Sequence, residues 1–226
     1  FEFEDIETNE SIGTNFSGVV KEAYEKQVRF FKEYLDLVVF RDVVERHGIK
    51  NIFVVKFLIK NIISSFSKEF SINKIFLTLK SQGIKISKKT LYTYVSYLED
   101  AFFHFPHKKF SYSLRKTELS IPKVYINDVG LINFSTFSPS EDIGKLMENI
   151  VFLELKRREI ESYYWKDIQH EVDFVIKGET KEKKKELIQV CYDLSDIDTK
   201  KREFGSLIRA ADELKCKNLQ VITYDQ

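Results

Sequence analysis

The sequence predicts an α+β protein in which a helical module precedes a smaller unit that mixes helices and strands. Over the first half of the chain, apolar residues recur at three- and four-residue steps, the period of an amphipathic helix. After about residue 142, short runs alternate between apolar and polar residues, the period of a strand. Only 8 Gly and 3 Pro occur among 226 residues, so we expect long regular elements joined by short loops.

The helical module is expected over residues 21–135, after a linker at 1–20 that shows no clear period. A first helical stretch ends at His47-Gly48, because glycine readily adopts the left-handed backbone that closes a helix. A second helix is predicted over 52–65 from its run of apolar residues.

A helix-turn-helix and a hairpin complete this module. Gly83 ends one helix, whose apolar residues are Ile72, Ile75, Phe76 and Leu79. Ser87 is the expected N-cap of the next helix, with an inner face of Leu91, Val95, Leu98 and Phe102. Short β-rich pieces follow at 102–112 and 123–126. Two helices and then a hairpin, in this order, are the plan of a winged helix.

The second domain is expected over residues 136–226, with the element order αβββαβ. In this order a helix crosses from a hairpin sheet to a further strand. The predicted elements are a helix at 144–157, strands at 160–165, 171–176 and 187–192, a helix at 199–214 and a strand at 219–224. We expect the last helix to bury Leu207, Ile208, Ala211 and Leu214.

Composition restricts the class of protein. Lys and Arg number 36 against 35 Asp and Glu, a net charge of +1, so a nucleic-acid partner has to be judged from local charge. Cys191 and Cys216 lack disulfide or metal-ligand spacing, and no run reaches the ~20 apolar residues of a membrane span. We therefore expect a cytoplasmic protein with no membrane partner. The sequence has no phosphate-loop motif. It begins without a methionine and its only one is Met147, so we expect it to belong to a longer gene product.

Basic residues concentrate in the predicted helix-turn-helix and hairpin. Between Lys74 and Asp128, ten Lys and Arg stand against four acidic residues, a local charge of +6. Three of these lysines lie at the start of the second helix of the pair, the end that a recognition helix directs at DNA. The candidate nucleic-acid-binding residues are Lys85, Lys88, Lys89, Tyr92, Lys108 and Lys109. The alternative is that this basic surface packs against a partner domain.

Acidic residues converge in the second domain. Alternation in the run EVDFVI places Glu171 and Asp173 on one face of a strand and Val172 and Phe174 on the other. Gln189 lies on the next strand, and Glu148 lies on the preceding helix. Oxygen ligands from a helix and a central strand suit Mg²⁺, which assists phosphodiester cleavage. The alternative is that these are ordinary surface acids.

Several runs of this sequence resemble a known family. They are YLDLVVFRDVVERHGIKN (34–51), SKKTLYTYVSYLEDAFF (87–103), KVYINDVGL (123–131), ENIVFLELKRR (148–158), EVDFVI (171–176) and LIQVCYDL (187–194). In this order they resemble the region that follows the ATPase core in archaeal and bacterial P-loop ATPases of the AAA+ superfamily. Those proteins end in a domain of unknown function. The resemblance implies that an N-terminal ATPase core, which binds ATP and Mg²⁺, is a partner of this chain.

The C-terminal part of that family looks like the PD-(D/E)XK, or restriction-endonuclease-like, fold. The resemblance implies that Glu148 is the helix acid, Asp173 the metal-binding aspartate and Gln189 the replacement of the second acid, around Mg²⁺ or Mn²⁺. Cys191 stands where that fold has its lysine. A thiol cannot supply the ammonium that positions water or stabilises the phosphorane. Lys185 lies on a nearby charged turn and can replace that ammonium only if its side chain extends into the site.

Three functions stay open at this stage. The first is an accessory region of an AAA+-like ATPase, with a winged helix that binds DNA or docks the ATPase core and a degenerate nuclease-like domain. The second is an active Mg²⁺- or Mn²⁺-dependent endonuclease that cuts double-stranded DNA. The third is a protein-interaction or assembly module, for example in a homo-oligomer, that has no nucleic-acid role.

Overall fold

The computed structural model describes residues 39–135, 143–177 and 185–224, together with residues 26, 29, 33 and 37. The linker predicted at 1–20 lies outside these residues. The chain divides into two compact units, Phe1–Lys50 and Asn51–Gln226. Helices and sheets are combined in the second unit, so the predicted α+β class is confirmed. None of the helices in the described part of the chain is long and apolar enough to span a membrane.

The first unit contains a π-helix, η1 (Val39–Glu45). The chain leaves this helix through Gly48, which has a φ of +60°. The N–H of Gly48 donates to the carbonyl of Glu45 at 3.2 Å. A left-handed backbone at this point favours glycine, so the predicted end of the first helical stretch is confirmed.

The second unit begins with helices around a small sheet. Its elements are α2 (Ile52–Ser64), β1 (Lys68–Glu69), α3 (Ile72–Ser81), α4 (Lys88–Asp100), β2 (His104–His107), α5 (Leu114–Glu118), β3 (Lys123–Ile126) and α6 (Val129–Ser135). The strand β3 lies between β1 and β2 and is antiparallel to both. Ser87 caps α4 as predicted, because its hydroxyl accepts from the N–H of Thr90 at 3.0 Å. The short elements β1, α5 and α6 were not predicted.

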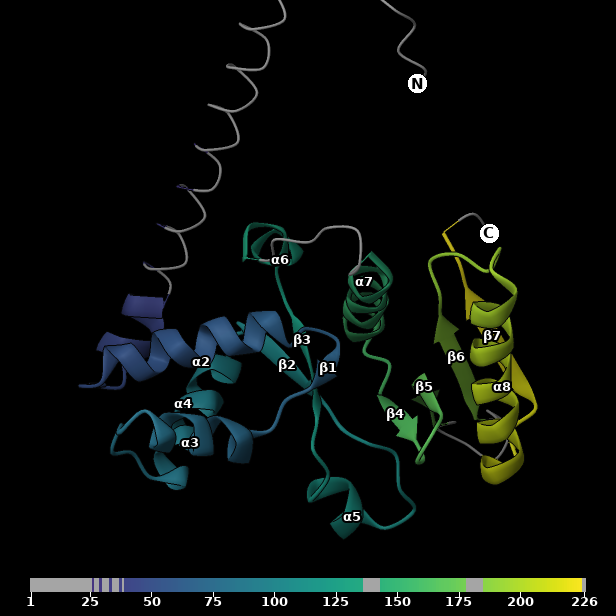
Figure 1. Cartoon of the computed structure of the whole chain (residues 1–226), viewed down its shortest axis with the longest axis horizontal. Helices are drawn as coiled ribbons and strands as arrows, with labels where there is room; N and C mark the ends of the chain where they lie inside the picture. Colours follow the sequence, from purple (N-terminus) through teal and green to yellow (C-terminus); the bar gives the residue numbers. More distant parts are fainter. Residues whose placement is uncertain are drawn as a thin grey trace, which may run out of the picture. The chain divides into compact units, whose positions relative to one another are not determined.

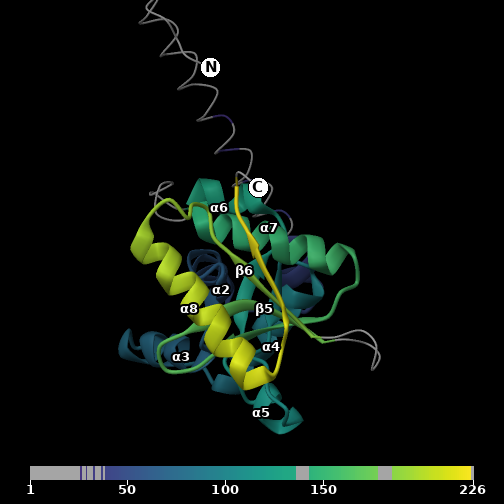
Figure 2. The same ribbon diagram turned by 90° about the vertical axis from the view of Figure 1, so that its right-hand side faces the viewer.

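The remaining elements form a four-stranded sheet with helices on its two faces. They are α7 (Ile143–Arg157), β4 (Ser162–Lys166), β5 (Glu171–Ile176), β6 (Glu186–Val190), α8 (Ile197–Leu214) and β7 (Asn218–Ile222). The strands β4, β5 and β6 are antiparallel neighbours, and β7 runs parallel to β6. This is the predicted order αβββαβ. The helices α7 and α8 lie on opposite sides of the sheet (Figure 1), and α8 runs along the sheet (Figure 2).

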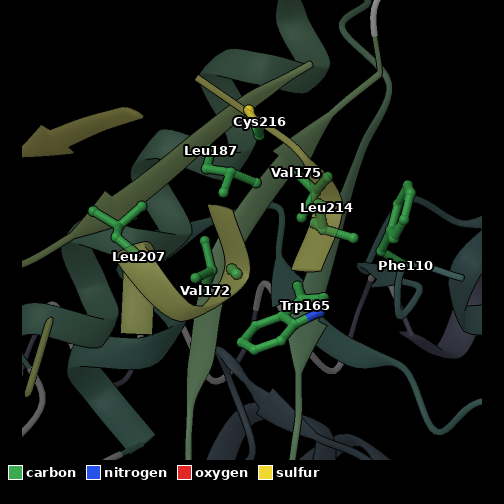
Figure 3. Close-up of a cluster of buried hydrophobic side chains, with 9 residues drawn as sticks. Phe110, Trp165, Val172, Val175, Leu187, Leu207, Leu214 and Cys216 are labelled. Carbon is green, nitrogen blue, oxygen red and sulfur yellow. The ribbon is translucent and has the colours of Figure 1, made fainter. Parts of the chain in front are cut away.

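Two apolar clusters cover the two faces of this sheet. Figure 3 shows the cluster on the α8 side, formed by Phe110, Trp165, Val172, Val175, Leu187, Leu207, Ala210, Leu214 and Cys216. The cluster on the α7 side is formed by Tyr125, Phe152, Leu155, Phe174, Ile188 and Val190. The helix α8 buries Ala210 and exposes Ile208, so the predicted burial of Ile208 is wrong. Each cluster includes a residue from the β2–β3 region, Phe110 in one and Tyr125 in the other, so this region contributes to the apolar packing on both faces of the large sheet.

A register shift between β4 and β5 places one side chain of β5 on the face of the sheet opposite to the predicted one. Tyr163 pairs with Val175 and Trp165 pairs with Val172, so Asp173 and Phe174 together stand opposite Tyr164. Phe174 therefore packs in the α7-side cluster, whereas Val172 packs on the α8 side. The predicted sharing of one face by Val172 and Phe174 is wrong, because simple alternation takes no account of a bulge that re-aims side chains.

The connection between β2 and β3 attaches the small sheet to the larger one. The N–H of Phe110 donates to the carbonyl of Tyr164 at 2.7 Å, and the N–H of Tyr164 donates to the carbonyl of Lys108 at 3.1 Å. These two bonds continue the sheet beyond β4. They hold β3, which begins with Lys123, next to the acidic residues of β5.

Candidate functional site

Lys123 is the centre of a buried group of charged residues. All four residues of β3 are buried, and Lys123 is only 2% exposed. Its Nζ lies 2.6 Å from Glu171 Oε1, 2.8 Å from Glu148 Oε1 and 3.3 Å from Asp173 Oδ1. We call Lys123, Glu148, Glu171 and Asp173 the lysine–carboxylate cluster. It joins the small sheet, the helix α7 and the large sheet.

The hydrogen-bonding capacity of Lys123 is fully used. An ammonium carries three N–H donors, and three carboxylates accept from this one. Each carboxylate has a further donor: Tyr125 Oη at 2.5 Å from Glu148, Val190 N at 2.9 Å from Asp173 and Lys166 Nζ at 3.0 Å from Glu171. A buried charge needs such complete pairing, because an unpaired one costs several kcal/mol.

An amide side chain fixes α7 against β3. Asn149, which is fully buried, accepts from the N–H of Ile126 at 2.8 Å and donates to the carbonyl of the same residue at 2.9 Å. Because Asn149 follows Glu148 on α7, these two bonds set the position of the glutamate over β3. The Tyr125 and Phe152 rings stack with centroids 4.0 Å apart and support the same contact.

The cluster shifts the acidity of its members. Burial alone disfavours charge on Lys123, but Glu148, Asp173 and Glu171 more than offset this and hold its pKa well above the usual range. Burial, followed by repulsion from Glu148, raises the pKa of Asp173 to about 8. Burial opposes ionisation of Glu171, yet Lys123 keeps its pKa below the usual value. At neutral pH, Asp173 therefore holds a proton and the other two acids are paired with lysines.

Gln189 does not join this group. Its Oε1 accepts from the N–H of Asp173 at 3.3 Å, and its Nε2 donates to Glu203 of α8 at 2.6 Å. The amide oxygen that was predicted to face a metal is used by the backbone, and the rest of the side chain turns to α8. The structure thus brings Glu148 and Asp173 together and places Gln189 beside Asp173 but directed away from Glu148.

The ammonium beside Glu148 and Asp173 belongs to Lys123 of β3, a different strand from the one that carries Cys191. Cys191 is buried at the end of β6, and its thiol donates to the carbonyl of Asp193 at 3.1 Å. Lys185 lies elsewhere, with Nζ 2.6 Å from Tyr112 Oη and 3.2 Å from the carbonyl of Leu214. Lys123, and neither Cys191 nor Lys185, contacts Glu148 and Asp173. Sequence reasoning counted Lys123 only as part of the basic surface, although its position in the buried run KVYI was a signal.

The arrangement does not fit a divalent metal ion. Mg²⁺ and Mn²⁺ need several free oxygen ligands, and the oxygens that face one another here already surround an ammonium. Gln189 offers no further ligand to this position. Within the described ranges, no group of three or more His, Cys, Asp or Glu is arranged to hold a metal.

The predicted nucleic-acid-binding residues separate into two groups. Lys85, Lys88, Lys89 and Tyr92 are exposed, at or near the start of α4. Lys108 instead pairs with Glu118 at 2.8 Å, and Lys109 is half-buried. Because Lys123 is buried and paired, the +6 predicted from the sequence overstates the charge that solvent meets.

These features define an α+β protein with a buried lysine–carboxylate cluster between two sheets. The family described as Domain of unknown function (DUF8612) matches residues 17–141. This match covers more than half of the 226 residues, so the chain belongs to that family. The matched part includes Lys123 and the small sheet, whereas β4 to β7 lie beyond it.

Two curated proteins are similar to this chain. Uncharacterized protein MJ1544 of Methanocaldococcus jannaschii is 44% identical over 200 residues, which cover 86% of this chain and 43% of that protein. An uncharacterized protein of Haemophilus influenzae is 28% identical over 140 residues, which cover 62% of this chain and 35% of that protein. The chain thus spans less than half the length of either relative. No solved structure matches it.

Proposed function

We propose that this chain is an accessory region of an AAA+-like ATPase, with a DNA-binding or docking winged helix and a catalytically silent nuclease-like domain. The observation that carries this proposal is the saturation of Lys123 by Glu148, Glu171 and Asp173. Acids that meet a scissile phosphate need solvent and free oxygens. Glu148 and Asp173 are only 7% and 6% exposed, and both are neutralised from within.

The order of elements supports both parts of the proposal. Helix, strand, two helices and two strands, with β3 central in the sheet, agree with a winged helix in which α4 is the recognition helix. The order α7-β4-β5-β6-α8-β7 agrees with a PD-(D/E)XK-like core. Both relatives are more than twice as long as the matched part, which leaves room for an ATPase core in a longer protein.

The surface at the start of α4 suits the phosphate backbone of DNA. Lys85, Lys88 and Lys89 are exposed and have no ion-pair partner among the described residues. Lys88 Nζ lies 5.2 Å from the centroid of the Phe76 ring, which directs that side chain along α3. Each lysine that neutralises a phosphate releases counterions, so such binding weakens steeply with salt.

Binding of duplex DNA across a salt series tests this surface. Joint replacement of Lys85, Lys88 and Lys89 by Ala is expected to weaken binding and to lower the slope of log affinity against log salt by up to about 2.7, from about 0.9 per phosphate contact. The matched control replaces Lys200, Lys201 and Lys217, which are also exposed and carry the same total charge. If both triple variants bind like the wild type, the surface is not a DNA site and the protein-interaction alternative takes its place.

Plasmid nicking in the presence of Mn²⁺ tests whether the nuclease-like domain is catalytically silent. We expect no conversion of supercoiled plasmid by the wild-type chain, because Lys123 occupies the position between the two acids. Nicking by the wild type that Asp173→Asn abolishes overturns the proposal and establishes the endonuclease alternative. Nicking that persists in Asp173→Asn identifies a contaminating nuclease.

A further inference from the structure

A second charged region lies next to the lysine–carboxylate cluster, on its solvent side. A cavity of about 470 Å³ is bounded by β1, the β2–β3 connection, β4 and α8. Its charged and hydroxyl-bearing lining, apart from Tyr164, consists of Glu69, Lys109, Ser111, Lys116, Ser120, Lys166 and Glu213. Lys166 Nζ lies 3.0 Å from Glu171 Oε2 and 3.4 Å from Glu69 Oε2, so it links the cavity to the cluster. The volume is in the range that holds small ligands.

Two lysines of this cavity lack an ionic partner. Within the described part of the chain, neither Lys109 nor Lys116 forms an ion pair, whereas Lys166 is shared between two glutamates. Lys109 is held in place by its own backbone, because its N–H donates to Ser120 Oγ at 3.3 Å. That hydroxyl in turn donates to the carbonyl of Thr117 at 2.7 Å, which ties it to the helix that carries Lys116. The two free ammonium groups, of Lys109 and Lys116, therefore belong to one segment that these hydrogen bonds hold in place.

Aromatic residues form the inner wall of the cavity. Phe110 and Trp165 belong to the α8-side cluster (Figure 3). The fully buried Tyr164 also lines the cavity, and its ring centroid lies 5.7 Å from Lys123 Nζ of the charged cluster. Tyr164 Oη lies 2.6 Å from the carbonyl of Ile121 and 3.1 Å from Glu69 Oε1. An apolar wall keeps water away from one side of a bound ion, and this strengthens its attraction to nearby charges.

We propose that this cavity binds a phosphoryl anion, either the terminal phosphate of a nucleic-acid strand or free phosphate. The nucleic-acid source rests on the proposed function, whereas the free-phosphate source does not. A phosphate monoester carries close to two negative charges and three strong acceptor oxygens. Lys109 and Lys116, which have no ionic partner among the described residues, match this charge, and Ser111 adds a hydroxyl donor. A monocarboxylate has half the charge and fewer oxygens, so it is bound more weakly.

Replacing Glu69 is expected to change phosphate affinity in the direction opposite to replacing the lysines. It is the acid that neutralises Lys166 on the cavity side. Glu69→Gln keeps an oxygen for Tyr164 but removes one negative charge and frees Lys166 for the ligand. Phosphate affinity is therefore expected to rise in Glu69→Gln, and to fall in the double variant Lys109→Gln, Lys116→Gln. Because these side chains are exposed or half-exposed, the variants are expected to fold like the wild type.

The test is calorimetric titration of the full chain with inorganic phosphate, with acetate as the control anion. A second arm uses a short DNA duplex with and without 5′-phosphates. The Lys109/Lys116 double variant is expected to bind phosphate about tenfold or more weakly, the scale of losing charged hydrogen bonds. Lys201→Gln, Lys217→Gln is the matched control and is expected to bind like the wild type. Tighter binding of the 5′-phosphorylated duplex assigns the cavity to strand ends, and equal binding of both duplexes assigns it to free phosphate.

Two results overturn the proposal. One is that wild-type chain binds no inorganic phosphate at millimolar concentration and does not distinguish the two duplexes. The other is that Glu69→Gln and the Lys109/Lys116 variant change affinity in the same direction. Failure of the proposed function is separate, because it is read from the salt dependence of the Lys85, Lys88 and Lys89 variant on unphosphorylated duplex.

Discussion

Lysines occupy two contrasting regions of this molecule. At the start of α4, Lys85, Lys88 and Lys89 are exposed and surrounded by water. In β3, Lys123 is 2% exposed and surrounded by three carboxylates. In the sequence these residues count equally toward one basic segment. In the structure, only the first group presents its charge to a partner.

The difference shows where each charge contributes free energy. A solvated lysine adds little to folding stability and attracts a phosphate through released counterions. A buried lysine adds nothing to the surface potential at its own position, yet its removal leaves acids without compensation. We therefore expect the two regions to respond oppositely to the same substitution, with one controlling binding and the other controlling stability.

The largest expected effect follows from removing Lys123. Lys123→Met keeps most of the side-chain volume but leaves Glu148, Glu171 and Asp173 without their shared cation. The free energy of unfolding is expected to fall by about 3–5 kcal/mol, the cost of breaking a buried ion pair from one side. Urea unfolding followed by circular dichroism measures it.

Two further variants make this prediction decisive. Lys89→Met is the matched control in the solvated region and is expected to change stability by at most about 0.5 kcal/mol. The triple variant Lys123→Met, Glu148→Gln, Asp173→Asn removes the charge of Glu148 and keeps residue 173 neutral at every pH, so it is expected to recover part of the loss. A Lys123→Met protein as stable as the wild type contradicts the role given to the cluster.

The same contrast explains what the sequence could predict. Helical periods located α2, α3, α4 and α8, and alternation located β5 and β6 to within a few residues. These patterns are local, because each reports one buried face of one element. The pairing of Lys123 with Glu148 and Asp173 joins residues 25 and 50 positions apart, which no local pattern records.

Local strand geometry explains the remaining site errors. The register shift opposite Tyr164 turned Phe174 to the side of Asp173, and alternation alone cannot reveal a bulge. Gln189 was expected to face a metal, but it bonds to the backbone of Asp173 and to Glu203 on α8. The acids themselves, Glu148 and Asp173, were identified from the resemblance and do lie together around one group.

The next expected effect is a change of stability with pH. The folded-state pKa of Asp173 is raised to about 8, far above its value of 3.8 in an unfolded chain. The folded protein therefore holds a proton that the unfolded chain lacks, and stability falls as pH rises toward 8. Between pH 7 and 8 the loss is expected to be about 1 kcal/mol, from about 1.4 kcal/mol per proton and pH unit. Urea unfolding at intervals across this range measures it.

The chosen range isolates Asp173 from other groups. Burial lowers the pKa of His104 to about 4 and that of His107 to about 3, so their effect has the opposite sign and lies mainly below pH 6.5. Burial raises the pKa of Cys191 from 9.0, so its effect begins near the upper limit of the range. Asp173→Asn is expected to flatten the dependence between pH 7 and 8. An unchanged slope in that variant assigns the dependence to another residue.

The smallest expected effect comes from an ion pair that resembles the buried one in distance but not in environment. Lys108 and Glu118 lie 2.8 Å apart, as do Lys123 and Glu148, but their side chains are 44% and 61% exposed. Water screens this pair, and holding two long side chains together costs entropy, so a double-mutant cycle with Lys108→Ala and Glu118→Ala is expected to give a coupling of at most about 1 kcal/mol. The same cycle with Lys123→Met and Glu148→Gln is expected to give a larger coupling, because neither residue can recover water when its partner is removed. Equal couplings for the two pairs would mean that distance, and not burial, determines what a lysine contributes in this fold.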